Sequence, residues 1–131
     1  MHANVIYARW LYAVAGSWGL LILVPMFFLE DYFSRTSPPA ITHPEYYYGF
    51  VGVAVAFQLL FLIIAADPVR YRPAMLAAII EKFSYGIATL VLYNHGRVWG
   101  GPLFGGVVDL AFGVLFVAAY VMLRRNARYY A

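Results

Sequence analysis

The chain has 131 residues, of which 64% are hydrophobic and only 11% are charged, so its composition excludes an ordinary soluble domain and predicts an integral membrane protein. Nine Lys and Arg residues stand against six acids, and no cysteine is present, which excludes disulfide, iron–sulfur and thiolate–zinc chemistry. The length allows four spans with short connections. We therefore expect one all-α membrane domain, a four-transmembrane-helix up-down bundle.

Four apolar segments are long enough to cross a bilayer, and they cover residues 8–29, 45–66, 73–94 and 103–123. The first carries Pro25 in its last third, where a kink is tolerated if neighbouring groups satisfy the freed carbonyl. A signal peptide is the weaker alternative for this segment, because its apolar run exceeds the length of a signal core. The polar residues 30–44 that follow predict a loop that can include a short interfacial turn.

The second span begins with three tyrosines, residues 46–48, which are typical of a headgroup-level aromatic belt. Gly49, Gly52 and Ala56 share one of its faces, and Gln58 lies on the opposite one. Small residues let membrane helices approach closely. We expect this glycine-bearing face to contact the glycine-bearing face of the fourth span.

The third span carries two charges in its interior, Glu81 and Lys82. Each charged side chain near the bilayer centre costs about 2.5–3.5 kcal/mol on insertion scales, so both need a reason. Helical geometry places Lys82, Tyr85 and Gly86 on an inward face, with Glu81 at its edge. Adjacent helix residues do not face each other, so each charge is expected to seek a partner on a neighbouring helix.

The fourth span supplies one such partner, Asp109, on the same face as Gly106 and Gly113. Leu110 and Val114 are predicted to lie on the opposite, lipid-facing side. Lys82 can reach Asp109 if its stem extends along the bundle, which leaves Glu81 to accept a hydrogen bond from a neighbour such as Tyr85 or Gln58.

The sequence thus predicts one interior cluster at compatible depths, consisting of Gln58, Glu81, Lys82, Tyr85 and Asp109. One interpretation is an ion-pair network that fixes helix register. The other is a site for a proton, an ion or a ligand. His43 and His95 stand in separate loops without metal-ligand spacing, so we expect no metal site and no cofactor.

Arginine placement predicts the orientation. Six arginines belong to the N-terminus, the second loop and the C-terminal tail, namely Arg9, Arg70, Arg72, Arg124, Arg125 and Arg128, against Arg35 and Arg97 in the other loops. Both termini are therefore expected to be cytoplasmic, in the inner (plasma) membrane. Arg70 and Arg72 are either topology determinants or ligands for an anionic lipid headgroup.

The stretch Asp67-Pro68-x-Arg70-Tyr71-Arg72-Pro73, followed by Glu81-Lys82, resembles small bacterial four-span membrane proteins of unassigned function. Size and hairpin layout are similar to the DoxX-like and BphX-like groups. The resemblance implies a bacterial inner-membrane location and transfers no site residue.

Three function classes follow from the sequence. The first is a non-catalytic membrane module, an accessory subunit or homo-oligomer whose partners are membrane lipids and another membrane protein, without nucleic acid. The second is a binder of a lipid, quinone or other hydrophobic small molecule in an interior pocket around Lys82, Tyr85 and Asp109. The third is a membrane-embedded enzyme or proton-coupled carrier using Glu81, Lys82 and Asp109. Its carrier version is least favoured, because four spans without an inverted repeat leave little room for alternating access.

Overall fold

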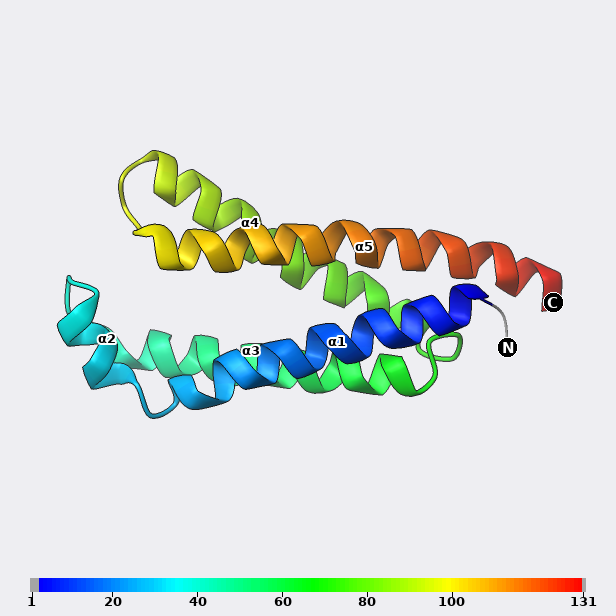
Figure 1. Ribbon diagram of the computed structural model, residues 1–131, viewed down its shortest axis with the longest axis horizontal. Coiled ribbons are helices and arrows are strands. Elements are labelled where there is room, and N and C mark those ends of the chain that lie inside the picture. Colours follow the sequence, from blue (N-terminus) through cyan, green and yellow to red (C-terminus); the bar gives the residue numbers. More distant parts are fainter. Residues whose placement is uncertain (1–2, 131) are drawn as a thin grey trace.

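The computed structural model describes the backbone of residues 3–130 and the side chains of residues 3–124. Its elements are α1 (Ala3–Met26), α2 (Glu30–Thr36), α3 (Pro44–Ala66), the 3₁₀ turn η1 (Arg72–Ala74), α4 (Met75–Asn94) and α5 (Gly100–Tyr130), with no strand between residues 3 and 130 (Figure 1). The helices α1, α3, α4 (with η1) and α5 are each long and apolar enough to cross a membrane. The protein is therefore an all-α, multi-pass membrane protein, as the composition predicts.

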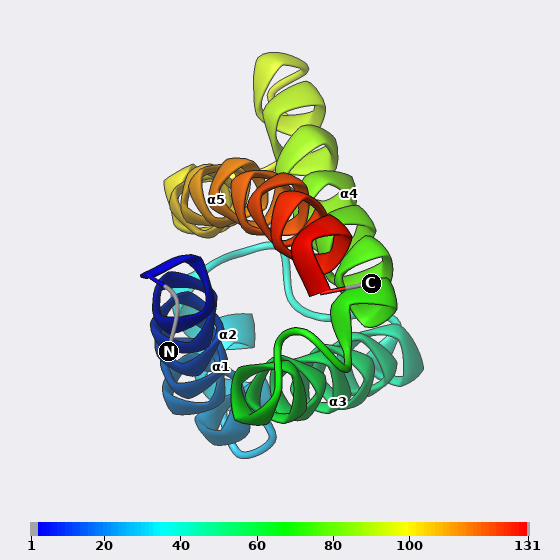
Figure 2. The same cartoon turned by 90° about the vertical axis from the view of Figure 1, so that its right-hand side faces the viewer.

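The four long helices form two antiparallel hairpins. The helix α1 packs along α3, and α4 packs along α5. The hairpins converge at the end that holds both chain termini, and they spread apart toward the end that holds α2 (Figure 1). Viewed along the bundle, α1 and α3 lie on one side and α4 and α5 on the other (Figure 2). The predicted four-helix up-down arrangement is confirmed, and its asymmetry divides the molecule into a closed end and an open end.

Aromatic packing holds the closed end together. Tyr12 of α1 stacks on Phe116 of α5 with ring centroids 4.1 Å apart, and Phe61 of α3 meets Phe116 edge-on at 5.2 Å. Such aromatic pairs add about 0.5–1.5 kcal/mol beyond the area they bury. Met75 of α4 is also fully buried in this cluster. All four spans thus meet in one core near the termini.

The structure changes the bounds of the first helix. It covers residues 3–26 instead of 8–29, and it ends in a tight turn, where the backbone N–H groups of Phe27 and Phe28 bond to carbonyls three residues earlier. The predicted loop contains a two-turn helix, α2, with Glu30 and Asp31 in its first turn and Arg35 in its last. These charges complement the helix dipole, a signal that the sequence already carried.

The expected contact between the glycine faces of the second and fourth spans is also wrong. A Cβ on Gly52 would meet nothing within 4 Å, so this face of α3 is open. The glycines of α5 instead pack against α4: a Cβ on Gly106 would overlap Thr89 Oγ1. Leu110 does not face lipid, because its Cγ lies 2.5 Å from where a Cβ on Gly86 would stand. Chain order decides these contacts, since α4 and α5 are consecutive and joined by a short turn.

Candidate functional site

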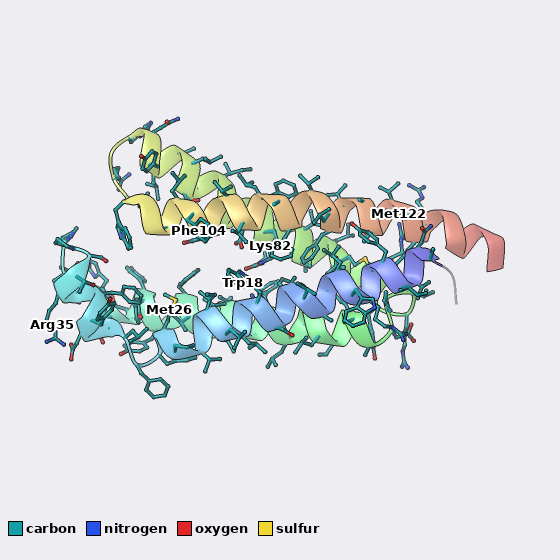
Figure 3. All side chains as sticks on the ribbon, in the orientation of Figure 1. Trp18, Met26, Arg35, Lys82, Phe104 and Met122 are labelled. Atoms are coloured by element: carbon teal, nitrogen blue, oxygen red, sulfur yellow. The ribbon has the colours of Figure 1, made fainter. Side chains whose placement is uncertain are left out.

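A cavity of about 530 Å³ lies between the two hairpins at the open end. Its walls are mostly apolar and come from three spans, with Trp18, Ile22, Leu23 and Met26 of α1, Phe50 and Ala54 of α3, and Phe104 and Val108 of α5. In Figure 3, Trp18 and Lys82 lie between the two hairpins. A volume of about 300–1,000 Å³ is usual for sites that bind small molecules. The cavity therefore has the size and lining of a site for an apolar ligand.

The floor of this cavity is polar. All five residues of the predicted interior cluster line it, namely Gln58, Glu81, Lys82, Tyr85 and Asp109. Lys82 donates a hydrogen bond to Asp109, with Nζ 3.2 Å from Oδ1. Its distance to Glu81 Oε2 is longer, 3.7 Å. The pairing across helices α4 and α5 thus has the partner expected from the sequence, with Glu81 second.

The Lys82 side chain is buried, and its ammonium lies near two aromatic rings. It is only 4% exposed, and its ammonium lies 5.0 Å from the ring centroid of Phe61 and 5.7 Å from that of Phe112. Aromatic faces attract cations, so these two rings stabilise the buried ammonium of Lys82. Phe61 also belongs to the aromatic core, which means that the closed end forms the base of the site.

Two buried acceptors on the floor are left without hydrogen bonds. Gln58 is 1% exposed; its Nε2 donates to the Ala54 carbonyl at 2.9 Å, and this bond fixes which way the amide points. Its Oε1 and the Oε2 of Glu81 have no hydrogen-bond donor among the described residues. The expectation that Glu81 accepts from Tyr85 or Gln58 is therefore wrong. An unsatisfied buried polar atom costs about 1–3 kcal/mol, and the closed end also holds such atoms, namely Arg9 Nε, Tyr12 Oη and Arg72 Nη2.

Tyr85 was expected to donate a hydrogen bond to Glu81, but it packs against α3 instead. Its ring stacks on Phe50 of α3, with centroids 5.5 Å apart and an interplanar angle of 23°. On the other side of this pair lies a second cavity of about 490 Å³, open between α3 and α4, which Phe50, Tyr85 and Glu81 also line. The Phe50–Tyr85 pair thus stands between the central cavity and the lipid-facing side of the bundle, with Glu81 touching both spaces.

The mouth of the cavity is formed by residues that the sequence analysis did not single out. Phe33 of α2, the loop residues Ser37 and Ile41, and Trp99 before α5 line it. Two tyrosines from the start of α3 hold this region: Tyr47 donates to the Met26 carbonyl, and Tyr48 donates to Glu30 Oε2 at 2.8 Å. The aromatic run at 46–48 was the available signal, but its partners could not be inferred from spacing alone.

The predicted headgroup residues Arg70 and Arg72 lie at the opposite, closed end. Arg72 is engaged within the bundle: its Nε donates to the Tyr120 carbonyl at 3.0 Å, and its guanidinium lies 3.7 Å from the Tyr120 ring centroid. Arg70 is exposed; its backbone N–H donates to Asp67 Oδ1 at 3.1 Å, and its guanidinium lies 5.4 Å from the Tyr71 ring centroid. The structure therefore brings neither arginine to the cavity. The side chains of Arg125 and Arg128 lie outside the described residues.

The remaining polar residues offer little chemistry. His43 Nδ1 lies 3.4 Å from Glu45 Oε1 on the exposed surface. Within the described part of the chain, no group of three or more His, Asp or Glu side chains is placed to hold a metal ion.

Comparison with known proteins gives no further assignment. No family model matches the chain, and neither the curated proteins nor the solved structures provided a match. The likeness to the DoxX-like and BphX-like groups therefore stays a prediction. The structure itself shows a four-helix bundle of membrane-spanning length, with an apolar cavity above a charged floor.

Proposed function

We propose that the protein binds a hydrophobic small molecule or a lipid chain inside the membrane. The observation that carries this proposal is the cavity of about 530 Å³, whose apolar walls end on a buried polar floor. Most binding pockets combine largely apolar walls with a few placed polar groups that orient the ligand. Of the three function classes, ligand binding accounts for the cavity, the two acceptors without hydrogen bonds and the ion pair together.

The proposal includes an orientation. Arg9, Arg70, Arg72 and Arg124 belong to the closed end, where cytoplasmic arginine is expected by the positive-inside rule. Both termini are then cytoplasmic in the inner membrane, and the cavity opens toward the outer leaflet. A ligand reaches the cavity either at its mouth or from the lipid between α3 and α4, past the Phe50–Tyr85 pair.

Photo-crosslinking tests the location of the ligand. A lipid with a diazirine near the end of its chain, incorporated into membranes that contain the protein, should label half-buried cavity residues such as Leu23 and Val108 above the level of an outward residue such as Val114. Val114 is 60% exposed, and it reports ordinary lipid contact. Labelling confined to outward faces would contradict the proposal.

A second candidate is an accessory or self-associating membrane module, favoured by the open face of α3. A Cβ on Gly49 or Gly52 would meet nothing within 4 Å, so a second helix has room to approach closely there. Substituting Gly52→Leu should then reduce self-association measured by energy transfer between labelled copies in liposomes. Unchanged energy transfer would exclude this face as a contact between copies.

A further inference from the structure

The floor of the cavity carries an excess of acceptors and of negative charge. The charged residues that line it are Glu81, Lys82 and Asp109, so two carboxylates face one ammonium and one negative charge remains. The closer carboxylate, Asp109, is bound to Lys82 at 3.2 Å, which leaves Glu81 as the group in excess. The two acceptors without donors, Gln58 Oε1 and Glu81 Oε2, lie on this same floor.

We infer that the ligand carries a hydrogen-bond-donating, positively charged amine at the end of its apolar chain, seated against Glu81 and Gln58. This inference rests on the proposed function and names the ligand's chemical class. An ammonium supplies donors to acceptors that lack them, and it balances the negative charge in excess. Charge-assisted hydrogen bonds of this kind are roughly twice as strong as neutral ones.

Other headgroups fit this floor less well. A carboxylate adds a third negative charge to a floor that holds one ammonium, and it brings acceptors where acceptors are already in excess. Lys82 cannot compensate, because Asp109 and the rings of Phe61 and Phe112 already surround its ammonium. An alcohol offers a single donor and no charge. The floor therefore selects the amine over an acid or alcohol with the same chain.

The position of Glu81 supports a role in capture from the membrane. Its side chain is 18% exposed, and it lines both the central cavity and the groove between α3 and α4. An amine entering from the lipid therefore meets Glu81 before the rest of the floor. Gln58, at 1% exposure, lies deeper, with its Oε1 packed against Gly19 of α1.

The test uses three probes with one chain, the ω-brominated forms of dodecylamine, dodecanol and dodecanoic acid. Bromine quenches the fluorescence of Trp18 and Trp99, which line the cavity. The Gly105→Leu variant, which places a side chain into the cavity, gives the background quenching from detergent partitioning. We expect saturable quenching above this background, with the amine binding at least about tenfold more tightly than the acid.

Two substitutions locate the headgroup. Glu81→Gln should weaken amine binding about tenfold and leave alcohol binding nearly unchanged, because it removes the charge in excess and keeps the shape. Glu45→Gln, the same change at an exposed site, should alter neither. If Glu81→Gln does not fold, Gln58→Met removes the other free acceptor, and it should also weaken amine binding several-fold.

The outcomes separate the two proposals. Equal binding of all three probes, tighter binding of the acid, or unchanged amine binding by both floor variants would overturn the amine inference while leaving a ligand-binding cavity. If none of the three probes binds the wild type more tightly than the Gly105→Leu variant, the proposed function itself is overturned. A brominated ethanolamine phospholipid, compared with its phosphatidylglycerol counterpart in nanodiscs, shows whether the amine belongs to a membrane lipid or to a single-chain molecule.

Discussion

At the scale of single residues, the central feature is the charged floor of the cavity, where the charges are paired but two acceptor oxygens lack hydrogen bonds. Lys82 has a direct partner in Asp109 at 3.2 Å and a more distant one in Glu81 at 3.7 Å. Burying such charges is costly, and the attraction between them repays the cost only with good geometry and further hydrogen bonds. One carboxylate oxygen lacks a hydrogen bond, so stability alone does not explain the arrangement.

A double-mutant cycle measures the ion pair. Lys82→Met should lower the free energy of unfolding by about 3–5 kcal/mol, because it leaves two buried carboxylates without a cation, and Asp109→Leu should cost less, because Glu81 remains 3.7 Å from Lys82. The double variant should lose much less than the sum. Thermal unfolding in detergent provides the comparison, and Lys82→Met combined with the exposed change Glu45→Gln serves as the additive control. Additive losses for Lys82 and Asp109 would show that the pair does not act as a unit.

At the scale of helices, the contact between α4 and α5 depends on small residues. Gly86 and Gly106 have no room for a Cβ, because Leu110 and Thr89 fill the space. Close backbone approach of this kind is how membrane helices gain packing energy where the hydrophobic effect is absent. Gly52 offers the contrast, since its surroundings are open.

Alanine substitutions should separate these glycines. Gly86→Ala and Gly106→Ala should each lower the free energy of unfolding by about 1–3 kcal/mol, because the added methyl group overpacks the α4–α5 contact. Gly52→Ala should be neutral or stabilising by up to about 1 kcal/mol, since alanine is the better helix former. Unfolding in detergent checks all three. Similar losses at all three positions would mean that the helices pack through other faces.

The helices also show what sequence can and cannot predict in this protein. Hydropathy and length located the four spans, and helical periodicity placed Lys82 and Asp109 on inward faces, since both signals are local. Which glycine face meets which helix is not local. Gly52 and Leu110 were misassigned because an apolar helix in lipid has no polar face to mark its outer side. An interior pocket was expected around Lys82, Tyr85 and Asp109, but its width could not be predicted, because it depends on how far the hairpins spread.

At the scale of the whole molecule, the two hairpins share one packed end and separate at the other. Packing of Tyr12, Phe61 and Phe116 closes the end with the termini, whereas the other end keeps a cavity under α2. This asymmetry gives the bundle a direction across the membrane. The distribution of arginine predicts that direction, with α2 at the outer surface in the proposed orientation.

Cysteine labelling tests the direction. The chain has no native cysteine, so each introduced thiol is the sole target. Thr42→Cys, exposed before α3, should react with a membrane-impermeant maleimide in intact spheroplasts. Val69→Cys, which is 50% exposed in the loop before η1, should react only after the membrane is permeabilised. The reverse pattern would place the cavity mouth in the cytoplasm.

The most direct test of the binding proposal is native mass spectrometry of protein purified from its membrane in mild detergent. Wild-type protein should retain a bound molecule, seen as a discrete added mass. Gly105→Leu should retain less of it, because its side chain takes up part of the cavity beside Tyr85. Gly100→Leu, on the same helix with nothing within 4 Å of its Cβ position, should keep it. An added mass retained equally by Gly105→Leu, or absent from folded wild-type protein, would contradict a ligand-binding cavity.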